Sequence, residues 1–195
     1  IPKNINSLCC GMPYLSKGYR AAYDVMAEKN KRTLLRQSKN NKIIITDNSP
    51  CTNTLQNTLN PNGQKNIEVL NPISFLRDLV IPNTKVNKRF NKIFYHSPCS
   101  MEGQGDKSDE IDLIKYFGKQ VDYPQQTICC GFAGDLGFFI PQLMKSATTT
   151  IKDKINLEQK YNQYCSTSIT CEMGLTQSTG KDFQSILSIA NKCLH

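Results

Sequence analysis

A repeated cysteine pattern constrains this chain more than any other feature. Two segments have the sequence Cys-Cys-Gly, and in each unit one further cysteine follows after 40 intervening residues, Cys51 after Cys10 and Cys171 after Cys130. A shift of 120 positions superposes Cys9, Cys10, Gly11 and Cys51 on Cys129, Cys130, Gly131 and Cys171. Such a match at a single offset indicates an internal repeat. We therefore expect two related units.

The second unit carries one cysteine that has no counterpart in the first. Cys99 precedes the Cys129-Cys130 pair, and the equivalent position in the first unit would lie before Ile1. We therefore expect the chain to be the C-terminal part of a longer polypeptide. The two repeats are expected at residues 1–88 and 89–195, with a lysine- and asparagine-rich seam at 83–91.

The nine cysteines of this 195-residue chain allow three interpretations. A disulfide scaffold is disfavoured, because an odd number cannot pair completely and adjacent cysteines rarely bridge each other. Buried structural thiols are the second interpretation. The third is ligation of zinc or of an iron–sulfur cluster, since thiolates suit both. The repeated spacing favours this third interpretation, although neither zinc-ribbon nor ferredoxin spacing is present to choose between the two.

Thiols from three separate places in the second unit are expected to converge, because strand ends and helix starts meet at one edge of an α/β sheet. The expected ligands are Cys99, Cys129, Cys130 and Cys171. A second, incomplete or purely structural site is expected at Cys9, Cys10 and Cys51. Gly11 and Gly131 are expected to adopt positive φ and let backbone N–H groups approach the sulfurs, or else simply to start helices.

Short β-like runs alternate with amphipathic helical stretches, which predicts an α/β fold of two pseudo-repeated lobes with largely parallel sheets. Strands are expected at 42–46, 67–70, 92–96 and 120–123, and helices at 15–26, 74–79, 136–155 and 183–194, with a possible helix start at Pro141. A turn is expected at 60–63 and a flexible loop at 101–108. The nearby acidic side chains are expected to form a solvated face: Glu102, Asp106, Asp109 and Glu110.

The net charge of +8 arises largely from basic residues between positions 17 and 42. A solvated helix face explains such a cluster, and docking on an acidic partner or an anionic membrane surface is the alternative. Nucleic acid is not expected as a partner, because Trp is absent and aromatic residues make up only 8%. No apolar run has the length of a transmembrane helix.

Three further side chains are candidates for the same chemistry. His96 is expected to be a hydrogen-bonded structural residue, with metal ligation as the alternative. Cys165 is expected to be a strand thiol, with a role as an extra ligand as the alternative, and Cys193 is expected to be a core residue of the last helix.

Five segments carry a family resemblance. They are CCGMPYLSKG at 9–18, TDNSPCT at 46–52, HSPCS at 96–100, CCGFAGDLGF at 129–138 and TCEMGLT at 170–176. Together they resemble the cysteine-rich CCG domain found in heterodisulfide reductase and in the cluster-carrying part of anaerobic glycerol-3-phosphate dehydrogenase. They are most similar to the C-terminal region of D-lactate dehydrogenases that contain FAD and iron–sulfur clusters.

The resemblance implies an electron-transfer module that does not oxidise substrate by itself. It implies a 4Fe-4S cluster on the cysteines, FAD and a ferredoxin-like segment elsewhere in the polypeptide, D-lactate or a similar 2-hydroxy acid as substrate, and a respiratory electron acceptor. The implied location is the cytoplasm, or the inner face of the plasma membrane as a peripheral protein. The alternative is a structural zinc-binding or metal-free module that packs against a catalytic lobe.

The sequence departs from the heterodisulfide reductase pattern at two places. That pattern ends in Cys-x2-Cys, whereas Asn48 and Ser168 stand where the first of these cysteines would be. The resemblance therefore implies four ligands in the second unit and three in the first, without the five-thiolate cluster of heterodisulfide reductase.

Overall fold

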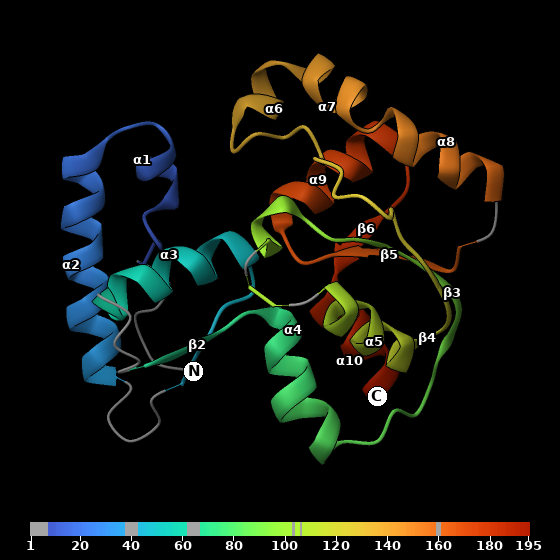
Figure 1. The fold of residues 1–195 in the computed structure, drawn as a ribbon, viewed down its shortest axis with the longest axis horizontal. Coiled ribbons are helices and arrows are strands. Elements are labelled where there is room, and N and C mark those ends of the chain that lie inside the picture. The colour runs from blue at the N-terminus through green and yellow to red at the C-terminus, as the bar shows by residue number, and fades with distance from the viewer. Residues whose placement is uncertain (1–7, 38–42, 62–66, 103, 106, 159–160) are drawn as a thin grey trace. The chain divides into compact units, whose positions relative to one another are not determined.

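The computed structural model describes residues 8–37, 43–61, 67–102, 104–105, 107–158 and 161–195. The chain forms two compact units, Ile1–Asn71 and Pro72–His195, which Figure 1 colours from blue to teal and from green to red. Ile73 and Leu76 pack into the core of the second unit, so residues 72–88 belong to that unit by packing. The boundary of the sequence repeat at residue 88 stays a prediction.

The first unit is a β-α-β element preceded by two helices. Helices α1 (Met12–Ser16) and α2 (Arg20–Gln37) come first, followed by β1 (Ile43–Ile45), α3 (Ser49–Leu59) and β2 (Glu68–Leu70). β1 and β2 are parallel, with Ile44 opposite Val69. Parallel strands need a crossover, which α3 supplies, and its apolar side chains bury against the strands. The core is small and contains a cysteine: Cys10, Leu55, Leu59, Ile67 and Val69.

The second unit is built on a four-stranded parallel sheet in the order β4-β3-β5-β6. Its strands are β3 (Phe90–His96), β4 (Gly118–Asp122), β5 (Gln163–Ser166) and β6 (Phe183–Ser185). Helix α5 (Lys107–Phe117) joins β3 to β4, and α9 (Ile169–Thr179) joins β5 to β6. Between β4 and β5 lie α6 (Leu136–Phe139), α7 (Pro141–Ala147) and α8 (Thr149–Glu158), and α10 (Ile186–Leu194) ends the chain.

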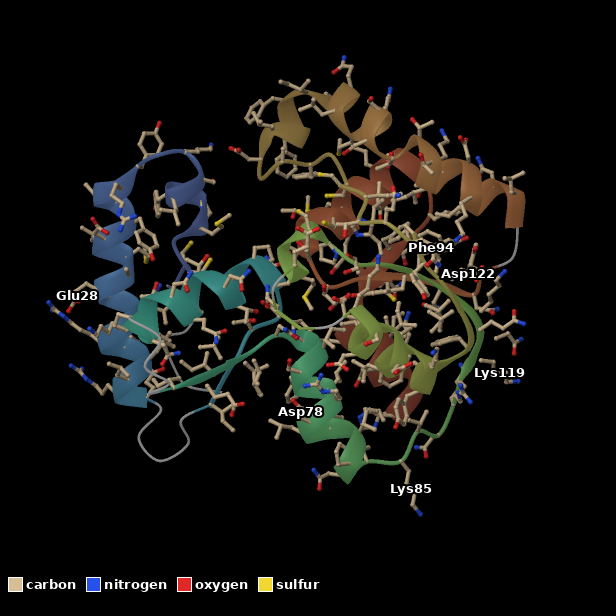
Figure 2. All side chains as sticks on the ribbon, viewed as in Figure 1. Glu28, Asp78, Lys85, Phe94, Lys119 and Asp122 are labelled. Carbon is tan, nitrogen blue, oxygen red and sulfur yellow. The ribbon has the colours of Figure 1, made fainter. Side chains whose placement is uncertain are left out.

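Helices cover both faces of this sheet (Figure 1). Alternate residues of the central strand β3 enter two different cores, as the period of a strand requires. Ile93 and Tyr95 pack with α5, α10, α4 (Pro72–Phe75) and the π-helical turn Leu76–Val80 that follows it. Phe94, labelled in Figure 2, packs on the other face with α7, α8 and α9. The core that contains Phe94 also contains Cys130 and Cys171.

The internal repeat is a repeat of structure as well as of sequence. β1-α3-β2 and β5-α9-β6 are the same parallel β-α-β element. Asn48 is the N-cap residue of α3 with φ −140° and ψ 118°, and Ser168 is that of α9 with φ −140° and ψ 123°. The two caps are 120 positions apart, the offset of the cysteine repeat.

The predicted α/β class and the parallel sheets are confirmed. β1 to β4 lie where strands were expected, and α7 begins at Pro141. Three helices and two strands were not predicted: α3, α5, α9, β5 and β6. The predicted helix at 183–194 begins only at Ile186, because residues 183–185 form the edge strand β6.

Two expectations about the segment after β3 were wrong. Residues 101–108 are not a continuous loop, since Cys99–Met101 is a 3-10 turn and α5 begins at Lys107. Glu110 is buried rather than solvated, and its Oε2 accepts a hydrogen bond of 2.6 Å from the hydroxyl of Tyr95. Asp106 and part of the expected turn at 60–63 lie outside the described residues.

No helix within the described ranges combines the length and the apolar character that crossing a membrane requires.

Candidate thiol site

Three separate segments bring four cysteines into one region of the second unit. Cys99 begins the 3-10 turn after β3, Cys129 and Cys130 lie between β4 and α6, and Cys171 is the third residue of α9. Cys130 and Cys171 share one buried cluster, whereas Cys99 and Cys129 are exposed. The site therefore has a buried half and a half open to solvent.

The thiols of Cys130 and Cys171 act on each other's ionisation as a hydrogen-bonding pair. This interaction lowers the pKa of Cys130 to about 7 and, together with burial, raises the pKa of Cys171. One proton between the two sulfurs satisfies both, so the first thiolate forms readily and the second is resisted. Burial raises the pKa of Cys99, and the charges of Cys129 and Cys130 raise it further. The ionisation of Cys99 therefore depends on the charges of Cys129 and Cys130.

Backbone and hydroxyl donors surround the sulfurs. The N–H of Gly131 donates to Sγ of Cys129 at 3.3 Å, and the backbone of Phe132 lowers the pKa of Cys130. The hydroxyl of Ser168, which is hydrogen-bonded to that of Thr170 at 3.1 Å, lowers the pKa of Cys171, while Cys130 and burial raise that pKa by more. Donors of this kind stabilise negative charge on sulfur.

Gly131 has the conformation that the sequence predicted. Its φ is 71°, and a Cβ there would lie 2.6 Å from the carbonyl oxygen of Leu143 and 2.8 Å from Cα of Met144. Only glycine lets the chain turn toward the sulfurs while it packs directly on the backbone of α7. The expected positive φ at Gly11 and Gly131 is confirmed.

The first unit repeats this arrangement with three cysteines. Cys10 and Cys51 act on each other's ionisation in the same way, which lowers the pKa of Cys10 to about 6 and raises that of Cys51. The backbone of Met12 lowers the pKa of Cys10, as that of Phe132 does for Cys130. Gly11 has φ 93°, and a Cβ there would lie 2.8 Å from the ring of Tyr23.

A buried asparagine anchors the cysteine pair of the first unit. Asn30 on α2 is 1% exposed, and its Nδ2 donates to the carbonyl oxygen of Cys9 at 2.7 Å. The charge of Asp47 adds to the causes that raise the pKa of Cys51. The described part of this unit contains no fourth thiol in the role that Cys99 has in the second unit.

His96 is a buried structural residue, as the sequence predicted. It ends β3 and has no exposed surface. Its Nε2 lies 2.8 Å from the carbonyl oxygen of Ile128, so the ring proton is on Nε2, and its Nδ1 lies 3.3 Å from Oγ of Ser166. Burial lowers the pKa of His96, so the imidazole is neutral at neutral pH.

Two other thiols belong to cores. Cys165 on β5 and Cys193 on α10 are fully buried in the cluster on the opposite face of the sheet from Cys130 and Cys171. Burial raises the pKa of both thiols. The expected core position of Cys193 is confirmed, and Cys165 is a strand thiol.

The donor chemistry of the second unit fits an iron–sulfur cluster or zinc. All nine cysteines are free thiols. Within the described ranges, no group of three or more His, Cys, Asp or Glu side chains has the arrangement that would hold a metal ion as it stands. The thiols of Cys99, Cys129, Cys130 and Cys171 lie near enough to act on one another's ionisation, and backbone N–H donors of the kind beside Cys129 tune sulfur-ligated metals.

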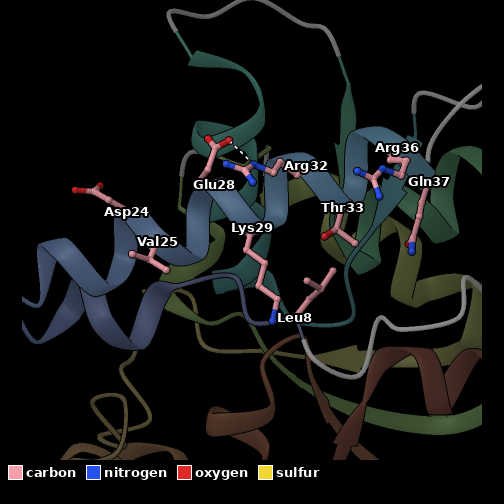
Figure 3. Close-up of a pocket in the computed structure, with 9 residues that line it drawn as sticks. All are labelled: Leu8, Asp24, Val25, Glu28, Lys29, Arg32, Thr33, Arg36 and Gln37. Carbon is pink, nitrogen blue, oxygen red and sulfur yellow. Dashed lines mark hydrogen bonds and ion pairs between the residues drawn. The ribbon is translucent and has the colours of Figure 1, made fainter.

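The basic residues of α2 lie on an exposed face that also carries carboxylates. Figure 3 shows the open groove along this helix, where Asp24 and Glu28 stand among Lys29, Arg32 and Arg36. Arg20 pairs with Asp24 at 3.3 Å and Arg32 pairs with Glu28 at 3.0 Å, one helical turn apart. Exposed pairs of this kind are typical of a solvated helix face.

Sequence reasoning missed the residues that support the cysteines. Ser166 is the last residue of β5, a strand that was not predicted. Ser168 lies two residues after that strand, at the start of α9. Asn30 lies in a polar helix and gives no local signal. The offset of 120 positions pointed to Ser168, because it aligns this residue with Asn48 at the start of a helix.

Comparisons with known proteins agree with this geometry. The cysteine-rich domain family called CCG matches residues 1–56 and 93–176, which include both cysteine pairs, Cys51, Cys99 and Cys171. One of the subunits of the fumarate reductase (CoM/CoB) of Methanothermobacter marburgensis is 26% identical over 180 residues, which are 90% of this chain and 35% of that protein. The chain thus spans about a third of the length of this curated relative. The family model matches more than half of the chain and includes both Cys-Cys-Gly segments. The chain therefore belongs to the cysteine-rich CCG domain family.

Proposed function

We propose that this chain is the electron-transfer module of an oxidoreductase and that the second unit holds an iron–sulfur cluster, of the 4Fe-4S type. The ligands would be Cys99, Cys129, Cys130 and Cys171. The observation that carries the proposal is that these thiols, which lie on three segments, act on one another's ionisation, with the Gly131 N–H beside Cys129. Family membership and the similarity to part of a reductase complex support it.

The residues of this chain would do three things for such a cluster. When bound, the cluster supplies reversible one-electron storage. The N–H of Gly131, the backbone of Phe132 and the hydroxyl of Ser168 stabilise negative charge on the ligand sulfurs. The core around Cys130 and Cys171 excludes water from one side, and the exposure of Cys99 and Cys129 leaves the other side open to an electron donor or acceptor.

The test is metal analysis of protein purified without oxygen. We expect iron and acid-labile sulfide, a brown colour and broad visible absorption. Cys130→Ser should abolish the absorption, whereas Cys165→Ser, which changes a fully buried thiol of the other core, should retain it. A colourless protein that contains zinc would support the structural alternative, and Cys130→Ser protein with full iron content would refute the ligand assignment.

We propose further that the complete protein oxidises D-lactate or a similar 2-hydroxy acid. The five sequence segments that resemble D-lactate dehydrogenases support this substrate class. FAD and a ferredoxin-like segment would lie elsewhere in the same polypeptide, and a respiratory acceptor would take the electrons, in the cytoplasm or at the inner face of the plasma membrane. D-lactate should reduce the anaerobic complete protein and L-lactate should not. Absence of reduction by D-lactate would contradict the substrate and leave the electron-transfer proposal standing.

A further inference from the structure

One buried residue, through its ring and its backbone, connects all three segments that carry the cysteines of the second unit. His96 ends β3, three residues before Cys99. Its ring N–H on Nε2 donates to the carbonyl oxygen of Ile128, the residue directly before Cys129. Its backbone carbonyl accepts a hydrogen bond of 3.0 Å from the hydroxyl of Ser166, the last residue of the strand before Cys171.

The histidine is not needed to fill space. It is fully buried, and an apolar side chain would pack at that place without the cost of burying two ring nitrogens. What a histidine adds is a directed N–H at the end of the central strand. The Ile128 carbonyl that it binds belongs to a segment without regular secondary structure, so no strand or helix ladder fixes that peptide.

The next residues depend on the position of that peptide. Cys129 and Cys130 follow Ile128 directly, and the chain then turns through Gly131, whose place against α7 leaves no room for a Cβ. A rotation of the peptide at Ile128 would therefore move the Cys129 and Cys130 sulfurs relative to Cys99 and Cys171.

In the first unit, a different residue binds a backbone carbonyl one position further along, since Cys9 is equivalent to Cys129 and not to Ile128. There, Asn30 on α2 donates to the carbonyl of Cys9 at 2.7 Å. In both units a buried side-chain N–H thus binds a backbone carbonyl beside the cysteine pair, that of its first cysteine in the first unit and that of the residue before the pair in the second. This recurrence indicates that the cysteine segment needs an external donor to hold its conformation.

We propose that His96 is the positioning residue of the second thiol site. Its Nε2–H fixes the peptide that presents Cys129 and Cys130, from the same strand end that leads to Cys99. His96 does not ligate metal, because Nε2 is engaged with the Ile128 carbonyl and Nδ1 faces Ser166. The role of His96 at a metal site rests on the proposed function. Its role in holding the cysteine segment applies to the metal-free chain as well.

The test compares three variants of the chain. His96→Leu removes the donor, His96→Gln keeps an N–H at a similar reach, and Tyr95→Phe is the control. Tyr95 is the neighbouring residue of the same strand, is equally buried, and loses a hydrogen bond to Glu110 on the opposite face of the sheet.

The first readout needs no metal. In reduced metal-free protein, we expect hydrogen exchange at the amides of residues 129–132 to accelerate roughly tenfold in His96→Leu, to return toward wild type in His96→Gln, and to stay unchanged in Tyr95→Phe. Equal exchange of these amides in His96→Leu and Tyr95→Phe would overturn the proposal, whether or not the protein binds iron.

The second readout uses protein reconstituted with iron and sulfide without oxygen. His96→Leu should shift the electron paramagnetic resonance signature of the reduced cluster, and Tyr95→Phe should leave it as in wild type even if it lowers stability. An unchanged signature in His96→Leu would refute the positioning role. If wild-type protein takes up no iron, the proposed function fails, and the exchange measurement still decides the role of His96.

Discussion

At the scale of single residues, Gly131 offers the sharpest test of the site's backbone. Gly131→Ala would force a Cβ to within 2.6 Å of the Leu143 carbonyl at a φ of 71°. We expect the free energy of unfolding to fall by about 3 kcal/mol, since strain and overpacking add. Gly180 has the same φ of 71° with nothing within 4 Å of its Cβ position. Gly180→Ala should therefore cost only about 1 kcal/mol.

Urea denaturation of the reduced protein measures both glycine variants. Equal losses of stability in Gly131→Ala and Gly180→Ala would show that the close approach to α7 is unimportant.

Buried His96 should make stability depend on pH. Burial lowers its pKa below the ordinary 6.5, so between the folded-state pKa and 6.5 the unfolded chain binds more protons than the folded chain. This contribution to stability is fully present above 6.5 and is lost as the pH falls through the folded-state pKa. We expect the urea midpoint of wild type to fall below about pH 6.5 more steeply than that of His96→Gln. Parallel curves for the two proteins would contradict this prediction.

Residue types with strict chemical or conformational demands could be predicted from the sequence. The repeated cysteines and the glycines after them are of this kind, because few other residues can ligate soft metals or adopt positive φ. The burial of Glu110 could not be predicted, since the residues next to it in the sequence do not indicate its hydrogen bond with Tyr95. Partners that are distant in sequence decide whether a carboxylate is solvated or buried.

At the scale of elements, local pattern predicted β1 to β4 and missed β5 and β6. β3 has four buried residues in succession, whereas β5 has the sequence Gln-Tyr-Cys-Ser and β6 has only three residues. Helix α3 is rich in threonine and asparagine, which are weak helix formers, and it is stabilised by burial of Leu55 and Leu59. Tertiary packing determines these elements, so their local sequence does not predict them.

The packing of α5 on β3 gives the prediction at this scale. Tyr95→Phe would leave the buried Glu110 carboxylate without its donor at 2.6 Å, and we expect a loss of about 2 kcal/mol in the free energy of unfolding. The matched control is Tyr161→Phe. Tyr161 donates to Asp122, which keeps its ion pair with Lys92 at 2.9 Å, so that variant should lose less than about 1 kcal/mol.

Thermal or urea unfolding distinguishes the two tyrosine variants. If Tyr161→Phe lowers the free energy of unfolding as much as Tyr95→Phe does, burial of the carboxylate does not determine the loss of stability.

At the scale of the whole molecule, the two units share one arrangement and differ in the number of cysteines within the described residues. Each has a cysteine pair followed by a left-handed glycine and a third cysteine in the first turn of the crossover helix. In each, that third cysteine lowers the pKa of the second cysteine of the pair. The second unit adds Cys99, which is coupled to its other thiols.

For the 195-residue chain, this difference predicts an unequal distribution of metal between the units. Cys10 and Cys130 hold equivalent places, with 9% and 6% of their surface exposed, so Cys10→Ser and Cys130→Ser disturb their cores to a similar degree. Four thiolates complete the ligand set of a 4Fe-4S cluster and three do not. In protein prepared without oxygen, Cys130→Ser should lose nearly all iron and visible absorption, whereas Cys10→Ser should retain most of both. Circular dichroism checks that both variants fold. Equal iron loss in the two variants would mean that both units bind a cluster, and the assignment of Cys99 as the decisive fourth ligand would then be wrong.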